Sequence, residues 1–284
     1  MLPVRHRPSG TFQIMSKIES MQRILREEGP QSVITSGFTA LGKWWRQGEM
    51  WEFHKSEYVR IDGCRIGLDD PIAKGFRDLL TMGLFERPER QAIRRFLNPT
   101  FPVIELGGCI GVVACVTNAL LQNPQKHIVV EANPDAARIL EMNRQRNGCH
   151  FSILKAAVGY EAEFVDFVVN DANLLGSSSE IENGRKIRVP ATRLMDIVMQ
   201  QGFQRFSLVC DIEGTEVELV QNESALLASN AELIVMEVHE KLRGAGKIDS
   251  MLFDLQKVGF EIVFRVKDTY VLKNRNFVMR SEMQ

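Results

Sequence analysis

Acidic side chains stand at the ends of four predicted strands, and a histidine follows the last of them. The residues concerned are Glu105, Glu131, Asp211, Glu213, Glu237 and His239. A buried carboxylate is costly without a partner, so packing alone does not account for four strands that end in this way. In open α/β sheets, ligands bind in the crevice beyond the carboxyl ends of the strands. The pattern therefore predicts one acidic crevice, although any single carboxylate could instead cap a helix or end a strand at the surface.

A glycine-rich turn connects a short apolar strand, 103–106, to an apolar segment of helical length, 112–121. Its glycines are Gly107, Gly108 and Gly111. Glycine lets the backbone bend sharply and lets a ligand approach without a Cβ in the way. The first N–H groups of the following helix then point at that ligand. This strand, turn and helix predict a site for a cofactor that contains a nucleoside.

The type of cofactor depends on Glu131 and Cys109. Glu131 ends the second buried strand, 127–130, where a carboxylate can accept both hydroxyls of a ribose. Cys109 occupies the third position of the dinucleotide fingerprint G-x-G-x-x-G, so the glycine that lets a pyrophosphate come close is missing. This disfavours an NAD-dependent oxidoreductase. A βαβ unit with a glycine-rich turn and no ligand is the structural alternative.

The elements that position these residues alternate between strands and helices, which predicts a mostly parallel sheet with helices on both faces. Two closing strands, 260–266 and 269–272, are separated by two residues and must form an antiparallel hairpin. We therefore expect an α/β fold with a doubly wound, mostly parallel seven-stranded sheet whose last strand is antiparallel. That arrangement is a hallmark of the Rossmann-like class I methyltransferase fold, whereas the NAD-binding sheet normally lacks the antiparallel strand.

Local patterns predict the remaining elements. Asp62 and Gly63 indicate the turn of a hairpin within 58–67. The polar stretch 170–188 is expected to be a loop or hairpin at the edge of the site, followed by an extended segment, 189–194. The other expected strands are 103–106, 127–130, 151–158, 163–169, 206–211 and 232–238, and the expected helices are 71–85, 85–97, 112–121, 134–146, 195–201 and 247–258.

The chain divides into an N-terminal helical extension, residues 1–56, and one large domain, residues 57–284, with a cofactor-binding core at about 98–275. The extension contains Trp44, Trp45 and Trp51. Such aromatic residues could lie at a membrane interface, but they more often pack an extension against its own domain or a second subunit. Peripheral membrane contact and a homodimer are therefore both open.

Composition excludes several classes of protein. The 284 residues contain 35 Lys and Arg against 36 Asp and Glu, a net charge of −1, which gives no support for binding to nucleic acid. The five cysteines are odd in number and lie mostly within apolar runs, as expected of reduced thiols. There is no apolar stretch of about 18 residues and no apolar signal region. We expect a cytoplasmic protein without a transmembrane segment.

A series of segments between about residues 58 and 272 resembles the FkbM-type S-adenosylmethionine (SAM)-dependent methyltransferases. In chain order they are GLFE (83–86), IELGGCIG (104–111), IVVEANPD (128–135), GSSS (176–179), VPATRLMDIV (189–198), LVCDIEGTEVELV (208–220) and LIVMEVHE (233–240). The D-x-E-G-x-E piece is the most specific to the family. Its order and spacing relative to the other pieces make a chance resemblance improbable.

The resemblance implies transfer of a methyl group from SAM to a hydroxyl of a sugar, a glycan or another small natural-product acceptor. The residues expected to bind the cofactor are Glu105, Gly107, Gly108, Cys109, Gly111, Glu131, Ala132, Asn133 and Ala156. Glu131 would take the ribose, while Glu105 and the glycine turn would hold the methionine end. Methyl transfer mainly requires positioning of the two reactants and a base for the hydroxyl.

The expected catalytic residues are Asp211, Glu213 and His239, and the resemblance also puts Glu216 near the site. His239 has an ordinary pKa near neutrality and is a candidate base, although a lone histidine is more often structural. Asp211 and Glu213 could instead hold a divalent cation that orients a sugar diol. Two carboxylates are weak grounds for such a site, and no metal is expected.

The chain departs from the family pattern at four positions: Phe85 replaces Tyr, Glu105 replaces Asp, Cys109 replaces Asn and Ala132 replaces Pro. Cys109 removes a polar group from the cofactor turn. This motivates a second hypothesis, a catalytically inactive methyltransferase-fold protein that acts as a binding or scaffold partner.

Overall fold

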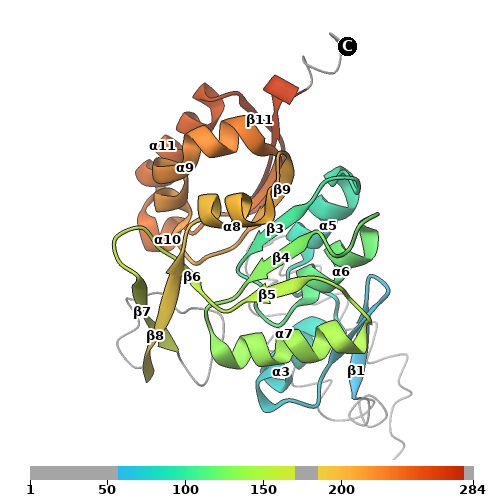
Figure 1. Cartoon of the computed structure of the whole chain (residues 1–284). Coiled ribbons are helices and arrows are strands. Elements are labelled where there is room, and N and C mark those ends of the chain that lie inside the picture. The colour runs from blue at the N-terminus through green and yellow to red at the C-terminus, as the bar shows by residue number, and fades with distance from the viewer. Residues whose placement is uncertain (1–56, 170–184, 278–284) are drawn as a thin grey trace, which may run out of the picture. The chain divides into compact units, whose positions relative to one another are not determined.

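A seven-stranded sheet forms the centre of the computed structural model, which describes residues 57–169 and 185–277 (Figure 1). The strand order is β11-β12-β10-β9-β3-β4-β5. The bounds are β3 (Val103–Leu106), β4 (His127–Val130), β5 (Ser152–Leu154), β9 (Phe206–Cys210), β10 (Ala231–Glu237), β11 (Phe260–Val266) and β12 (Thr269–Asn274). The predicted extension at residues 1–56 lies outside the described residues and stays a prediction.

The direction of the strands confirms the expected fold. Strands β5, β4, β3, β9 and β10 pair in parallel. The last strand, β12, is antiparallel to both of its neighbours, β10 and β11. The fold is therefore the mostly parallel, Rossmann-like sheet with an antiparallel last strand that the sequence predicted.

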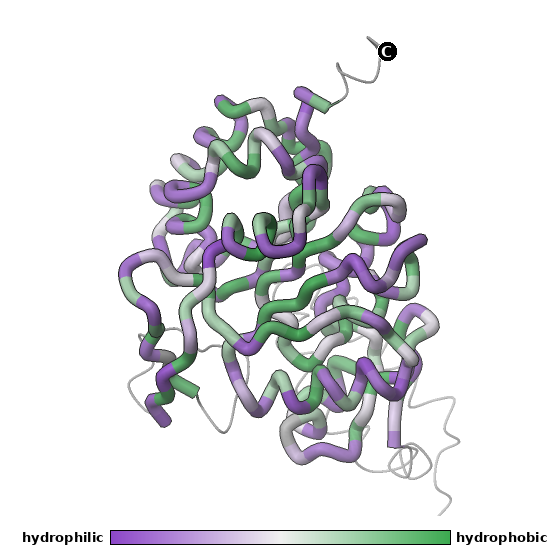
Figure 2. The backbone as a smooth tube through the Cα atoms, viewed as in Figure 1, coloured by the Kyte–Doolittle hydropathy of each residue, from purple (hydrophilic) through white to green (hydrophobic). Residues whose placement is uncertain are grey.

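Helices cover both faces of this sheet (Figure 1). On one face, α8, α9 and α11 pack against apolar side chains of the central strands. On the other face, α5, α6 and α7 bury a second set of side chains. The central strands are hydrophobic along most of their length because both of their faces are covered (Figure 2). The helix bounds are α5 (Arg87–Phe96), α6 (Val112–Leu120), α7 (Pro134–Arg146), α8 (Leu194–Gln201), α9 (Glu216–Asn230), α10 (Glu240–Arg243) and α11 (Ala245–Lys257).

Two smaller sheets flank the central one. The predicted hairpin is confirmed: β1 (Tyr58–Ile61) and β2 (Cys64–Gly67) pair antiparallel. A second sheet has the order β6-β8-β7, in which β7 (Phe164–Val169) and β8 (Arg185–Thr192) are antiparallel and β6 is Ala157–Val158. All five cysteines are free, as expected of reduced thiols.

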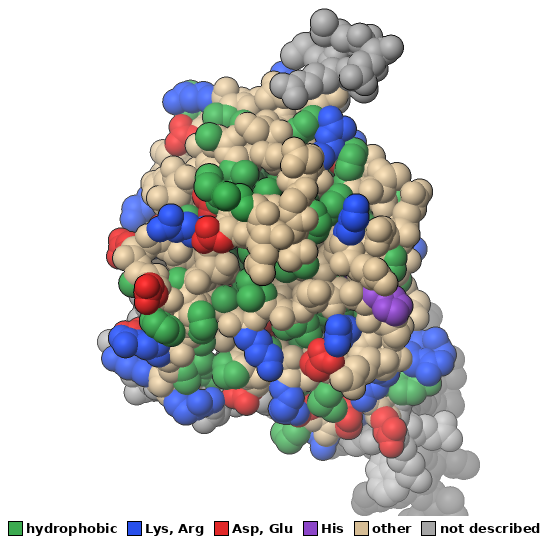
Figure 3. Space-filling view, viewed as in Figure 1, with side chains coloured by type: hydrophobic (Ala, Val, Ile, Leu, Met, Phe, Trp, Pro, Cys, Tyr) green, Lys and Arg blue, Asp and Glu red, His purple; other side chains and the backbone are tan. Residues whose placement is uncertain are grey.

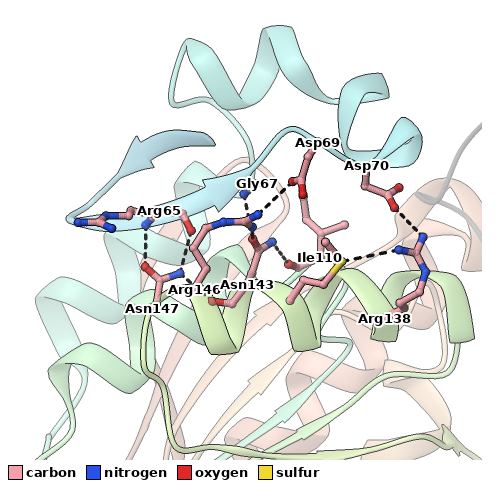
Figure 4. A network of polar contacts seen from close by, with 10 residues as sticks. Arg65, Gly67, Asp69, Asp70, Ile110, Arg138, Asn143, Arg146 and Asn147 are labelled. Atoms are coloured by element: carbon pink, nitrogen blue, oxygen red, sulfur yellow. Dashed lines mark hydrogen bonds and ion pairs between the residues drawn. The ribbon is translucent and has the colours of Figure 1, made fainter. Parts of the chain in front are cut away.

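Polar contacts tie α7 to the β1–β2 hairpin and to the glycine turn (Figure 4). The Asn143 amide accepts a hydrogen bond from the Gly67 N–H at 2.9 Å and donates one to the Ile110 carbonyl at 2.8 Å. Asn143 is fully buried. In the second turn of α7, Arg138 pairs with Asp70 at 2.6 Å. The hairpin therefore helps to hold the turn that precedes α6.

Two of the predicted elements in the first half of the domain are each divided in two. The expected helix 71–85 is two short helices, α3 (Pro71–Gly75) and α4 (Arg77–Thr81). The chain then turns at Gly83, where φ is +65°. The expected strand 151–158 is two strands in different sheets, because the Ala156 N–H bonds to the Leu154 carbonyl and turns the chain out of β5.

Later boundaries also differ from the prediction. Strand β8 begins at Arg185, inside the stretch expected to be a loop or hairpin, and pairs antiparallel with β7. It ends at Thr192, so Leu194 is helical rather than extended. Residues 170–184 lie outside the described residues. The sequence reasoning also missed α9, a helix of 15 residues.

The distribution of charge on the surface agrees with the nearly equal numbers of acidic and basic residues in the sequence. On the face shown in Figure 3, side chains of both charges are interspersed. Within residues 57–169 and 185–277, no helix combines the length and the apolar character that crossing a bilayer requires.

Candidate active site

The glycine turn lies where β3 ends and α6 begins, in close contact with its neighbours. Gly107 and Gly111 have φ values of +87° and +85°, a conformation that favours glycine. A Cβ on Gly107 would lie 1.7 Å from the carbonyl oxygen of Asp211, and one on Gly111 would lie 2.5 Å from the Leu140 side chain. Backbone conformation and lack of space therefore each require glycine at these positions, while the approach of a ligand to the turn stays a prediction.

The Glu131 carboxylate lies against this turn. Its Oε2 accepts a hydrogen bond from the Cys109 N–H at 2.6 Å, and its Oε1 accepts one from the Asn133 N–H at 2.6 Å. Burial raises the Glu131 pKa to about 7, although these N–H groups work in the opposite direction. Each carboxylate oxygen has two lone-pair sites, so each retains one for a ligand hydroxyl. The predicted ribose carboxylate is thus rigidly held and still able to accept.

Other predicted cofactor residues surround Glu131 in supporting positions. Cys109 adopts a left-handed conformation with φ of +45° and contributes its backbone N–H to Glu131. The Asn133 side chain caps α7 by accepting from the Asp135 N–H at 3.0 Å. Ala156 is buried in the core, while Ala132 is partly exposed. Their contacts with a cofactor stay a prediction.

The Glu105 side chain is buried beside His127, a contact that the sequence did not predict. Its side chain is 1% exposed, and its Oε2 lies 3.4 Å from Nε2 of His127. Among the described residues, neither carboxyl oxygen of Glu105 makes a hydrogen bond. Burial lowers the His127 pKa to about 3 and raises the Glu105 pKa. The two groups are therefore a neutral pair, and the assignment of Glu105 to the methionine end stays a prediction.

Glu86 is a further carboxylate near the glycine turn. In the sequence, only the family resemblance drew attention to it. It has φ of +47°, and its Oε2 accepts from the Val113 N–H, at the start of α6, at 3.3 Å. Burial, with the charges of Glu89 and Glu105, raises the Glu86 pKa well above its ordinary value. The raised pKa favours the neutral form of this carboxyl, so it serves the turn as the hydrogen-bond acceptor of the Val113 N–H.

The later strands bring the predicted catalytic residues together around His239. Its Nδ1 lies 3.1 Å from Oε1 of Glu216, the first residue of α9. Its Nε2 lies 3.3 Å from Oε2 of Glu213 and 3.5 Å from Oδ1 of Asp211. Asp211 follows β9 and His239 follows β10, two adjacent parallel strands whose carboxyl ends meet at one edge. The predicted convergence of Asp211, Glu213 and His239 is therefore present in the fold.

Glu216 completes this cluster as a fully buried carboxylate. Its Oε1 also accepts from the Ile212 N–H at 3.0 Å. Burial alone would lower the His239 pKa, but the hydrogen bond to Glu216 and the charges of Glu216, Asp211 and Glu213 raise it to about 9. His239 is accordingly an imidazolium at neutral pH, with one nitrogen held by Glu216 and the other facing two carboxylates.

The same cluster could hold a divalent cation. One donor atom each from Asp211, Glu216 and His239 lie within 4.8 Å of one another. Oxygen and imidazole ligands suit divalent metals such as Mn²⁺. A protonated His239 supplies positive charge to the same carboxylates from within the chain. The expectation of no metal stays a prediction.

A model of the methyltransferase FkbM domain matches residues 105–262. The chain belongs to the FkbM methyltransferase family. The match includes the glycine turn, Glu131, the segment 211–216 and His239, which confirms the resemblance seen in the sequence. No match was found among curated proteins.

Several solved structures are similar to this FkbM-family chain at low identity. A protein of the NADB-Rossmann superfamily from Streptococcus agalactiae is 11% identical, with 66% of this chain and 67% of that chain covered and a TM-score of 0.41. Fibrillarin from Aeropyrum pernix, in complex with natively bound SAM, is 11% identical, with 66% and 74% covered and a TM-score of 0.40. An rRNA methylase from Streptococcus thermophilus is 6% identical, with 66% and 95% covered and a TM-score of 0.42.

Proposed function

We propose that the protein is a SAM-dependent O-methyltransferase that acts on a hydroxyl of a sugar, a glycan or another small natural-product acceptor. One observation carries the proposal. The turn that holds Glu131 is in backbone contact with Asp211, so a nucleoside-binding carboxylate and the acidic cluster around His239 share one edge of the sheet. A methyl donor and an acceptor hydroxyl could therefore be held side by side.

The residues at the glycine turn suit SAM. The free lone pairs of Glu131 would accept the two ribose hydroxyls, and the Gly107–Gly111 backbone would lie beside the methionine end. Glu86 adds a partly buried carboxyl group at the N-terminus of α6, whose oxygens could accept hydrogen bonds from the ammonium group of the ligand. When bound, SAM supplies an electrophilic methyl group. The chain's own residues bind it, orient it and keep water away.

The cluster around His239 would manage the acceptor proton. When the acceptor oxygen takes the methyl group, its hydroxyl proton would pass to Nε2 of His239, which accepts a proton only in the neutral form of the imidazole. Glu216 would hold Nδ1–H and fix the tautomer, in the way that a carboxylate orients a histidine base in hydrolases. Asp211 and Glu213 would stabilise the imidazolium that results. Because the free enzyme holds His239 protonated below about pH 9, methyl transfer should accelerate as the pH rises toward that value.

The alternative, an inactive scaffold protein, rests on Cys109. In the structure that residue contributes its backbone N–H to Glu131, a contact that Asn would make equally well. The substitution therefore leaves the interaction between the turn and Glu131 in place, which favours the enzyme.

Calorimetric titration of the full chain with S-adenosylhomocysteine, with NAD as the control ligand, tests the proposal. We expect S-adenosylhomocysteine alone to bind, after which sugars and glycolipid precursors would be screened as methyl acceptors. Binding of neither ligand would overturn the enzyme hypothesis in favour of the scaffold.

A matched pair of variants tests the ribose assignment. Glu131→Gln puts an amide N–H₂ against one of two backbone N–H groups, so it should weaken S-adenosylhomocysteine binding at least tenfold. Glu261→Gln, at an exposed pair with Arg275, should leave it unchanged. Equal affinity in both variants would remove Glu131 from the ribose.

A further inference from the structure

A pocket of about 640 Å³ lies between the β1–β2 hairpin, the loop after α4 and helix α5. Five arginines line it: Arg60, Arg87, Arg90, Arg94 and Arg95. Asp62 is the one acidic residue among the described residues of its lining. The formal charge of the lining is therefore +4, in contrast to the mixed charges on the face shown in Figure 3.

The arginines converge because of helical spacing and one buried anchor. Arg87, Arg90 and Arg94 are three and four residues apart on α5 and so share one face. Arg90 is almost completely buried and has every nitrogen engaged: Nε donates to the Phe85 carbonyl at 3.0 Å, Nη2 donates to the Gly83 carbonyl at 2.7 Å, and Nη1 pairs with Asp62. Arg90 is therefore a rigid wall of the pocket rather than a group free to bind a ligand.

Asp62 does not neutralise the remaining arginines. Besides Arg90, it pairs with Nη1 of Arg94 at 3.0 Å, so one carboxylate serves two guanidinium groups. Arg95 stacks over the rings of Phe96 and Phe264, at 4.9 and 5.2 Å from their centroids. These aromatic faces offer no formal negative charge.

Arg60 and Arg87 carry the rest of the excess charge. The guanidinium of Arg60 lies 6.0 Å from the centre of the Tyr58 ring. Within the described part of the chain, neither Arg60 nor Arg87 pairs with a carboxylate. Arg87 is exposed, begins α5 and lines the pocket. Among the described residues, its guanidinium has no hydrogen-bond acceptor.

We propose that this pocket binds a phosphate-bearing molecule, with Arg87 and Arg94 as its principal contacts. The guanidinium fork matches the oxygens of a phosphate in a bidentate manner. A lining of charge +4 favours an anion with two or more negative charges, such as a phosphomonoester or a diphosphate. The volume exceeds that of a phosphate ion and lies within the range of small-molecule sites, roughly 300–1,000 Å³. The ligand should therefore carry a polar body as well as the phosphate.

The pocket is distinct from the glycine turn but connected to it through a short segment. Gly83 and Arg87 line the pocket, and Glu86 between them accepts the Val113 N–H at the start of α6. The proposal does not depend on SAM binding, because it rests on residues that the methyl-transfer site does not use.

Calorimetric titration of the full chain with sodium pyrophosphate, at ionic strength held constant with sodium chloride, tests the proposal. We expect saturable binding by the wild type, at least tenfold weaker binding by Arg87→Ala, and no detectable binding by the double variant Arg87→Ala, Arg94→Ala. Both side chains are exposed, so the melting temperature should hardly change. Arg188→Ala removes an exposed arginine paired with Asp166 on a different element and should bind like the wild type. Absence of saturable binding by the wild type, or equal affinity in the double variant, would overturn the proposal.

A vesicle experiment identifies the source of the phosphate. Phosphatidylcholine vesicles with and without phosphatidic acid would be floated with the wild type and with the double variant. Pyrophosphate binding without flotation supports a soluble phosphorylated ligand. Flotation that requires both phosphatidic acid and the two arginines supports a lipid headgroup in the same pocket.

Discussion

Gly107 and Asp211 are so close that a methyl group on the glycine would lie 1.7 Å from the aspartate carbonyl oxygen. The two residues follow adjacent parallel strands, β3 and β9, and the Asp211 N–H also donates to the Leu106 carbonyl at 2.9 Å. The glycine turn and the cluster around His239 are therefore joined through backbone contacts. We therefore expect a change in one to alter the geometry of the other.

Gly107→Ala should consequently destabilise the fold and weaken the cofactor turn. The new Cβ meets a backbone atom that cannot move alone, and φ of +87° is strained for alanine. We expect a loss of about 3 kcal/mol in the free energy of unfolding, measured by urea denaturation. Gly75→Ala is the control, because its Cβ would have no neighbour within 4 Å and its φ is not positive; it should change stability by less than about 1 kcal/mol. Similar losses in both variants would contradict the close contact.

The segments that were predicted correctly are those in which local and tertiary requirements agree. Strands β3 and β4 begin and end as expected, because their apolar runs are buried on both faces. Helix α7 was also predicted with the observed bounds, since Asn133 caps it and Pro134 occupies its first turn. For these elements, the local sequence alone determines where the strand or helix begins and ends.

The missed helix α9 shows where that agreement fails. Glu223, in the middle of α9, is buried and has non-helical φ and ψ values of −126° and 17°. Its carboxylate accepts from the Leu194 and Met195 N–H groups and from the Tyr160 hydroxyl. A charged residue on the buried side breaks the apolar stripe by which a helix is recognised. Its partners are 28 to 63 residues away in the chain, so sequence spacing could not supply them.

Some residues of the candidate site could likewise be predicted from the sequence, and others could not. The glycines, Glu131 and the residues around Asp211 were identified from motif spacing. The roles of Glu86 and Glu216 depend on contacts with Val113 and His239, 27 and 23 residues away, which only the folded chain brings together. The arginine pocket needs both the hairpin and α5, and its residues carry no motif.

Cys109→Asn should strengthen cofactor binding. Asn tolerates the left-handed conformation that Cys109 adopts, with φ of +45°, better than most side chains do. It also restores the polar group that the family usually has in the turn, while the backbone N–H to Glu131 is kept. We expect a severalfold lower Kd for S-adenosylhomocysteine by calorimetry, with unchanged stability. Weaker binding would show that the pocket has adapted to the smaller thiol.

Glu216→Gln should lower the pKa of His239. The glutamate raises that pKa through its hydrogen bond to Nδ1 and its negative charge, whereas Gln can keep the first and loses the second. NMR titration of the His239 ring should give a midpoint near pH 9 in the wild type and at least one pH unit lower in the variant. Glu261→Gln, far along the chain and exposed, should not move the midpoint. An unchanged or higher midpoint in Glu216→Gln would remove Glu216 as the residue that positions His239.

Glu105→Gln should stabilise the protein at high pH. The Glu105 carboxyl is buried, makes no hydrogen bond within the described residues and has a raised pKa. The folded state therefore binds a proton that the unfolded chain releases above about pH 4.5. As the pH rises from there toward the folded pKa, the wild type loses stability, whereas Gln has no proton to lose. We expect the variant to be more stable than the wild type at pH 8, with an advantage that shrinks as the pH falls toward about 4.5.

Urea denaturation at pH 5, 6.5 and 8, together with titration of S-adenosylhomocysteine, separates stability from function for Glu105. A buried acid that lowers the free energy of unfolding at neutral pH is typical of a binding site, because residues needed for binding often reduce the stability of the fold. If Glu105 holds the methionine end, the variant should gain stability and lose cofactor affinity. A pH-independent stability difference would show that Glu105 does not titrate, and a more stable variant with full affinity would make the carboxyl dispensable to the cofactor.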